Sequence, residues 1–132
     1  MPHDGQNMTH TPSLIVHDLR GLTAQALNVV DRICDTAKST LREIVTDGDH
    51  ISSVLIEENQ TAAHGVAWLA TYTQALNQMQ CWTDRLMADG KFGEIEQLIH
   101  QIAFAEYLLQ IAGGIQMNQG EVVRLQDMGL SA

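Results

Sequence analysis

The apolar positions from Leu14 to Ile44 recur every three or four residues, which is the spacing of one stripe along an α-helix. Charged side chains fall largely off this stripe. The pattern stops at Thr46-Asp47-Gly48-Asp49, where a glycine flanked by aspartates favours a turn. The sequence therefore predicts a first long helix that ends in a corner.

A second helical period begins at Val54, with Ser52 or Ser53 available as an N-cap. It continues for about 35 residues, or roughly 50 Å. Gly65 lies within this period, where the missing side chain favours a modest bend or lets another helix pack closely. The segment 88–93, Ala-Asp-Gly-Lys-Phe-Gly, predicts the second corner because its two glycines let the chain leave the helix.

A third helix is predicted from Ile95 to Ala112, ending at Gly113-Gly114. Its apolar residues cover more than half of its circumference. Such a helix either lies in the centre of a bundle or presents one face to another protein surface. The apolar residues that follow, as far as Leu130, keep neither a helical nor a strand period.

Three long helices joined by short loops predict an all-α fold: an antiparallel up-and-down bundle with a short C-terminal fourth element. The first and third helices should run in the same direction, against the second. Residues 1–13 contain both prolines and almost nothing apolar, so we expect a disordered N-terminal arm. The predicted organisation is an arm at 1–13, a helical bundle at 14–114 and a tail or linker at 115–132.

Composition narrows the class of protein. The 132 residues, 45% of them hydrophobic, suit one domain with a single core. Seven Lys and Arg against sixteen Asp and Glu give a formal charge of −9, so we expect neither nucleic acid nor a membrane as a partner. Cys34 and Cys81 lie far apart in the sequence and no secretion signal is visible, which favours a cytoplasmic location.

His64 is a candidate phosphotransfer residue, because that chemistry uses an exposed histidine in the middle of a bundle helix. The third and fourth residues after it are Ala67 and Trp68, so no cation is placed to hold a phosphoryl group. An ordinary helical histidine is the favoured interpretation. A histidine phosphotransfer-like signalling bundle remains an alternative.

No metal site is predicted. A di-metal carboxylate bundle needs Glu-x-x-His pairs on two helices, and the sequence has none. Glu96 and His100 are four residues apart, which is typical of a solvated contact on a helix surface. Asp47, Asp49 and His50 do not have the spacing of a calcium loop.

The aromatic residues and the cysteines are expected to be structural. Trp68, Tyr72 and Trp82 lie on the second helix, where aromatic residues are usually core or interface anchors. Cys34 and Cys81 have no histidine or cationic cluster nearby in the sequence that would activate a thiol, so we expect burial for both.

Three segments carry a resemblance to a known family: 62–72 (AAHGVAWLATY), 93–98 (GEIEQL) and 110–121 (QIAGGIQMNQGE). Together they resemble the helical N-terminal extension of certain bacterial acyl-CoA dehydrogenases, of the methylsuccinyl-CoA dehydrogenase-like type. The resemblance implies a parent enzyme that uses FAD to remove two hydrogens from an acyl-CoA thioester. For this chain it implies a helical domain and no cofactor of its own.

The segment 107–121 also resembles the last helices of the ordinary acyl-CoA dehydrogenase fold, where a Gln-x-x-Gly-Gly turn lies against the flavin and a glutamate base follows. This resemblance makes Gly113 and Gly114 candidate cofactor-binding residues. The position of the base falls on Gly120, with Glu121 one residue away, and a carboxylate moved by one residue points elsewhere. We therefore predict no catalytic residue, and a surface position for Glu121.

The leading hypothesis is a helical packing or oligomerisation domain of an FAD-dependent acyl-CoA dehydrogenase-like protein, inactive alone. Its expected partner is a second copy or the catalytic body of such an enzyme, contacted through the apolar faces of the second and third helices. A second hypothesis places Gly113, Gly114 and Glu121 at a flavin or acyl-CoA site that another chain completes.

Overall fold

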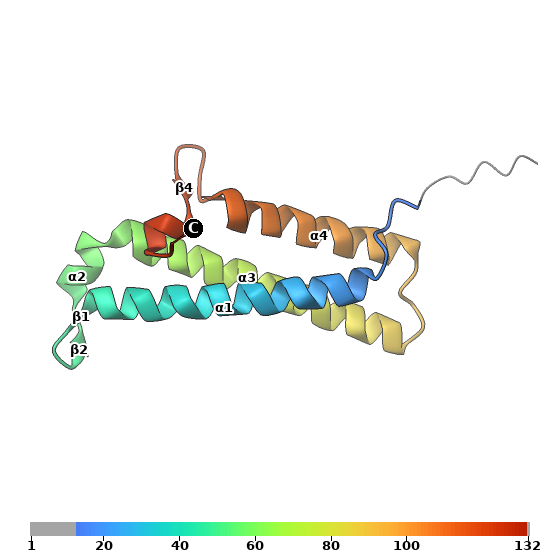
Figure 1. Ribbon diagram of the computed structural model, residues 1–132, viewed down its shortest axis with the longest axis horizontal. Coiled ribbons are helices and arrows are strands. Elements are labelled where there is room, and N and C mark those ends of the chain that lie inside the picture. Colours follow the sequence, from blue (N-terminus) through green and yellow to red (C-terminus); the bar gives the residue numbers. More distant parts are fainter. Residues whose placement is uncertain (1–12, 132) are drawn as a thin grey trace, which may run out of the picture.

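The computed structural model describes residues 13–131, and within them the chain forms four α-helices (Figure 1). These are α1 (Leu19–Val45), α2 (Ser53–Glu58), α3 (Gln60–Ala88) and α4 (Glu94–Gly113). Two short antiparallel pairs, β1 (Thr46–Asp47) with β2 (His50–Ile51) and β3 (Ile115–Gln116) with β4 (Val122–Val123), and the 3-10 helix η1 (Leu125–Met128) complete it. The predicted all-α bundle is confirmed. The expected arm falls on residues 1–12, outside the described residues, and on Ser13.

The helix α3 is the centre of the bundle. Helices α1 and α4 both pack against it and run in the direction opposite to it, while η1 lies over the N-terminal half of α3 beside α1 (Figure 1). The first and third long helices therefore point the same way, as the sequence predicts. Because α4 touches α1 only sparsely, α4 lies at the side of the bundle and not at its centre.

The first helix begins later than its apolar period predicts. Asp18 is the N-cap, and its side chain accepts a hydrogen bond from the backbone N–H of Gly21 at 3.3 Å. The preceding segment is held by Gln101 of α4 instead. Val16 N–H donates to Gln101 Oε1 at 2.8 Å, and Gln101 Nε2 donates to the carbonyl of Leu14 at 3.0 Å. These bonds to α4 keep the segment out of the helix.

The predicted second helix is divided at Asn59 into α2 and α3. Ser52 caps α2 by accepting the N–H of Leu55 at 3.3 Å. The side-chain amide of Asn59 donates to the carbonyl of Leu55 at 2.8 Å, and asparagine is prone to such local bonds, which compete with a continuous helix. The prediction of one unbroken helix is therefore wrong, and the break lies six residues before Gly65.

Gly65 is buried under the residues that follow α4. A Cβ atom at this position would lie 2.5 Å from Val123 Cγ2 and 3.1 Å from Met128 Cγ. Glycine is therefore required for close approach, as predicted, although β4 and η1 approach it and not a long helix. Val123 and Met128, together with Ile115, are almost completely buried in the core.

A polar network crosses the core beside these apolar residues. His100 of α4 has no exposed surface. Its Nδ1 lies 2.7 Å from Thr83 Oγ1, and its Nε2 lies 2.9 Å from Thr23 Oγ1, so the ring joins α4 to both other long helices. Since Thr23 Oγ1 lies 3.0 Å from the carbonyl of Leu19 and can donate to it, we assign the proton of a neutral imidazole to Nε2.

Burial lowers the pKa of His100 below its usual value, and the nearby Arg20 lowers it further. The expected solvated contact between Glu96 and His100 is therefore wrong. The reason is tertiary: threonine hydroxyls from α1 and α3 satisfy both ring nitrogens inside the core.

Candidate functional site

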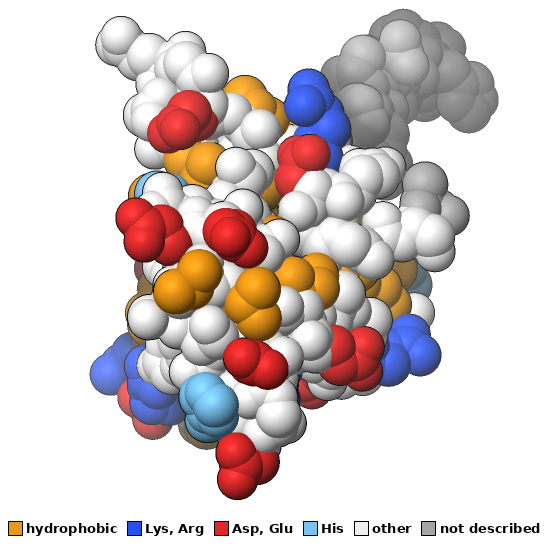
Figure 2. All heavy atoms as spheres, turned by 90° about the vertical axis from the view of Figure 1, so that its left-hand side faces the viewer, with side chains coloured by type: hydrophobic (Ala, Val, Ile, Leu, Met, Phe, Trp, Pro, Cys, Tyr) orange, Lys and Arg blue, Asp and Glu red, His pale blue; other side chains and the backbone are white. Residues whose placement is uncertain are grey.

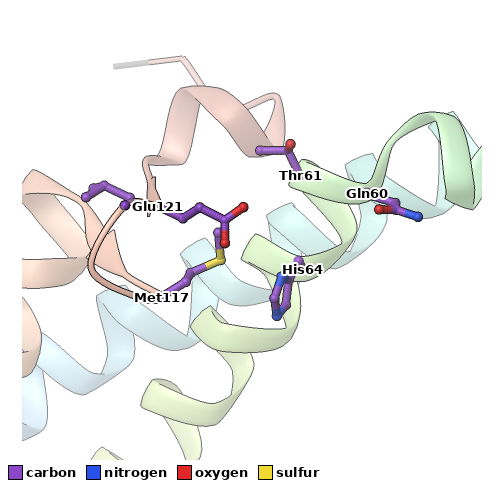
Figure 3. A pocket seen from close by; sticks show the side chains of 7 residues that line it. Gln60, Thr61, His64, Met117 and Glu121 are labelled. Carbon is purple, nitrogen blue, oxygen red and sulfur yellow. The ribbon is translucent and has the colours of Figure 1, made fainter.

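A pocket of about 320 Å³ lies where the β3–β4 hairpin meets the start of α3. Figure 3 shows Thr61 and His64 entering it from α3, and Met117 and Glu121 from the hairpin. The pocket is lined by Gln60, Thr61, His64, Met117, Gly120, Glu121 and Val122. The structure therefore brings together His64 and Glu121, which the sequence assigned to two different hypotheses.

His64 is exposed, and its ring is oriented by a neighbour on the same helix. Trp68 Nε1–H donates to His64 Nε2 at 3.2 Å, and the two ring centroids are 6.5 Å apart. A second hollow of about 280 Å³ lies beside this pair and is lined by His64, Ala67, Trp68 and Thr71. Among residues 13–131, no lysine or arginine lines either hollow, so a phosphoryl group on His64 would have no cationic partner there.

Glu121 is held at the pocket by the loop of its own hairpin. Its side chain accepts a hydrogen bond from Asn118 Nδ2, and its backbone carbonyl accepts from Met117 N–H at 2.9 Å. Asn118 Oδ1 in turn accepts from the N–H of Gly120 at 2.8 Å. The predicted surface position of Glu121 is confirmed, and Asn118 is a supporting residue that the sequence analysis missed.

Gly113 and Gly114 lie just outside this pocket, at the end of α4. Gly114 has a φ of 138°, and a Cβ atom there would lie 2.5 Å from Val122 Cγ1. Its N–H donates to the carbonyl of Gln110 at 2.8 Å. Glycine is thus needed at 114 to turn the chain into β3. A Cβ at Gly113 would meet nothing within 4 Å.

The outward face of α4 carries a row of large exposed apolar side chains. Ile95, Ile102 and Leu109 are 69%, 58% and 72% exposed, although the opposite face of the helix is buried against α3. Beside it, an apolar groove of about 360 Å³ lies between α4 and α1 and is also lined by Leu125 of η1. The outward face of α4 and the groove between α4 and α1 are therefore apolar surfaces that no other part of residues 13–131 covers.

A smaller apolar patch lies at the end of the bundle that carries α2 and the β1–β2 hairpin. Figure 2 shows hydrophobic side chains gathered there among acidic ones. Ile51, Val54 and Ile56 are its exposed large residues.

The amino-acid sequence is similar to part of a known enzyme. It is 50% identical over 123 residues to (2S)-methylsuccinyl-CoA dehydrogenase from Cereibacter sphaeroides, an acyl-CoA dehydrogenase. The resemblance to the acyl-CoA dehydrogenases is confirmed. The match covers 93% of this chain but 22% of the relative, so the chain spans less than a quarter of that protein's length. No family model matches the chain.

FAD, which the likeness to acyl-CoA dehydrogenases implies, does not fit the pocket as a complete site. The pyrophosphate of FAD is doubly negative, whereas this pocket presents the carboxylate of Glu121 and none of the lysines or arginines of residues 13–131. A volume of about 320 Å³ is also at the lower end for a drug-sized ligand. Contact with part of a flavin or acyl-CoA bound elsewhere stays a prediction for Gly113 and Gly114.

The aromatic residues of α3 are buried or half-buried and pack within the bundle. Tyr72 is buried, donates its hydroxyl proton to Gln110 Oε1 at 2.7 Å and packs edge-on against Tyr107 of α4. Burial raises the pKa of Tyr72, and the neighbouring Tyr107 adds to this effect. Trp68 and Trp82 are half-buried.

The remaining candidate residues lie apart from the pocket. Asp49 and His50 form an exposed pair, and within residues 13–131 no group of three or more possible metal ligands comes together. Cys34 is buried as expected, but Cys81 is exposed because it lies on the face of α3 that neither α1 nor α4 covers, so that expectation is wrong for Cys81. None of the described helices is both long enough and apolar enough to cross a bilayer.

Proposed function

We propose that this chain is a helical packing domain of an acyl-CoA dehydrogenase-like protein and does no chemistry alone. In this role its apolar surface lies against a catalytic dehydrogenase body or against another copy. The observation that carries the proposal is the outward face of α4, where large apolar side chains are exposed opposite the core. Exposed apolar patches of this kind mark interaction surfaces in soluble proteins.

The identity to the dehydrogenase supports the same role. The chain matches a small part of a much longer enzyme at 50% identity, which associates this helical unit with a catalytic body. The candidate base position is occupied by Gly120, and Glu121 bonds to Asn118 of its own loop. Neither feature supplies a positioned base for proton abstraction.

A chimera of the relative tests this proposal. The matched region of (2S)-methylsuccinyl-CoA dehydrogenase is replaced by this chain, and the flavin content, the mass by light scattering and the turnover are measured. We expect a yellow, assembled and active enzyme, while this chain alone remains colourless. A chimera that fails to assemble, although this chain folds alone, would contradict the packing role.

One observation favours a second candidate function. His64 and Glu121 line one polar pocket, although 57 positions separate them in the sequence. In this alternative they contact a flavin or acyl-CoA held mainly by the catalytic body. The variants Glu121→Gln and His64→Gln in the chimera distinguish the two functions, because loss of turnover with unchanged assembly supports the second and unchanged turnover supports the first.

A further inference from the structure

The exposed residues of α4 follow a heptad pattern. Apolar residues recur at alternating intervals of three and four along three heptads, which is the spacing of a coiled-coil seam. All of them are exposed or half-buried. The seam consists of Ile95, Leu98, Ile102, Ala105, Leu109 and Ala112.

We propose that a second copy of this chain packs antiparallel along this seam, around a two-fold axis between residues 103 and 104 of α4. This inference rests on the proposed packing function and gives it a geometry. The two-fold axis places Ile95 opposite Ala112 of the second copy and Ile102 opposite Ala105 of the second copy. Leu98 meets Leu109. Each large isoleucine is thus matched by a small alanine, which gives close packing without a void.

A parallel pair in register lacks this complementarity. Each seam residue would then face its own copy, so that Ala105 would meet Ala105 and Ala112 would meet Ala112. Two of the six layers would be underfilled, and unfilled layers lose dispersion contacts. The order of large and small side chains along α4 therefore favours the antiparallel arrangement.

The charges beside the seam fit the same arrangement. Helix α4 contains no lysine or arginine, and its three carboxylates are those of Glu94, Glu96 and Glu106. In the antiparallel pair Glu106 flanks Ile99 of the second copy, and Glu94 lies near Gly113 of the second copy. No carboxylate beside the seam then faces a carboxylate of the second copy, although the whole chain carries a formal charge of −9.

The large exposed side chains of α4 supply about half of the area that a standard interface takes from each partner. Ile95, Ile99, Ile102 and Leu109 together offer on the order of 400 Å² of apolar surface, at about 100 Å² for each side chain. A standard interface takes about 800 Å² from each partner. Leu98, Ala105, Ala112 and the polar residues that flank the seam supply the remainder along a helix of 20 residues.

Light scattering over a range of concentrations is the first measurement. We expect a dimer that Leu109→Lys weakens at least about 100-fold, because each dimer loses two buried leucines and gains two buried charges. The matched control is Val54→Lys on α2, since Val54 is 61% exposed and lies in the other apolar patch. Added salt should strengthen the dimer, because it screens the repulsion between two acidic chains.

Disulfide cross-linking then tests the direction of the pair, in a Cys81→Ser background that removes the exposed native thiol. We expect a mixture of Ile102→Cys and Ala105→Cys chains to form a mixed disulfide faster than either chain forms a disulfide with itself. Faster self-linking of Ile102→Cys would indicate a parallel pair and would overturn the proposal.

Three further outcomes also overturn it: a chain that stays monomeric at all concentrations, a dimer that Val54→Lys disrupts and Leu109→Lys does not, or equal effects of both substitutions. The proposed packing function is judged separately by assembly of the dehydrogenase chimera. A monomeric chain that still assembles in the chimera would remove the seam dimer and leave the packing function standing.

Discussion

Helices α1 and α4 flank the same central helix, but their solvent-facing sides differ. The exposed residues of α1 include cations and anions, as in residues 35–43, together with Leu22, Val29 and Ile44, whereas those of α4 include four large aliphatic residues, Glu94 and Glu106, and no lysine or arginine. Both helices bury their inner faces against α3. The difference is that the exposed apolar residues of α1 lie among charges of both signs, whereas those of α4 lie together without a cation, which favours α4 as the contact surface that we propose.

The largest expected effect on the free energy of unfolding is in the buried core, on the side of α4 opposite to its exposed face. Leu76 lies in α3 and is fully buried in the hydrophobic core. Leu76→Ala should lower the free energy of unfolding by about 2–5 kcal/mol, because a leucine is removed and a cavity remains. Urea denaturation followed by circular dichroism measures the change. A loss below about 1 kcal/mol would mean that the packing around α3 is loose.

The second effect concerns the polar contact that ties α4 to both other helices. His100→Ala should cost about 2–4 kcal/mol, since it leaves a cavity and removes the partners of Thr23 and Thr83. The same denaturation series measures it. His50→Ala, at an exposed position on β2, is the control and should have almost no effect.

The titration of His100 gives this network a pH dependence. Its pKa in the folded chain is lower than the usual value, so the unfolded chain binds the proton more readily. The stabilisation is present above the ordinary histidine pKa of about 6.5 and is lost progressively as the pH falls below it. Unfolding midpoints between pH 5 and 8 should show this loss in the wild type, and it should be smaller in His100→Gln.

A smaller effect is expected where the hairpin and η1 close the bundle. Gly65→Ala should cost about 1–2 kcal/mol, because the clash with Val123 and Met128 outweighs a gain in helix propensity of up to about 1 kcal/mol. Gly113→Ala is the matched control, since a Cβ atom there meets nothing, and it should be neutral or slightly stabilising. Equal effects of the two changes would show that the close approach at Gly65 is unimportant.

The smallest effect on stability is expected on the outer face of α4. Leu109→Ser in dilute protein, below the concentration at which the chain self-associates, should change the free energy of unfolding by less than about 0.5 kcal/mol. The same denaturation measurement checks it against Leu76→Ala. A large loss would show that Leu109 stabilises the single chain, and the contrast between α1 and α4 would then disappear.

The long helices and their corners are predictable from the sequence because their signals are local. Apolar period, Gly48, Gly90 and the end at Gly113 all act within a few neighbouring residues. The late start of α1 is not predictable in this way, since it depends on hydrogen bonds from Gln101, 85 residues away from Val16. The break at Asn59 has a local cause, a side-chain bond to Leu55, that the apolar period conceals.

The candidate site was predictable in its parts and not as a whole. His64 and Glu121 each attract notice in the sequence, but only the tertiary fold brings the hairpin to the start of α3. The burial of His100 depends in the same way on Thr23, which lies 77 residues away. By contrast, the heptad spacing on α4 is visible in the sequence. Only the structure shows that the residues with this spacing are exposed.

The close packing at Gly65 has a consequence for the order of folding. The contacts of Val123 and Met128 with α3 join residues far apart in the chain, and such contacts tend to form late because they close long loops. We therefore expect the β3–β4 hairpin and η1 to dock on α3 after the three long helices have packed. Since Glu121 belongs to the hairpin, the polar pocket that it forms with His64 is completed only at that step. The docking is possible because residue 65 has no side chain in the way of Val123 and Met128.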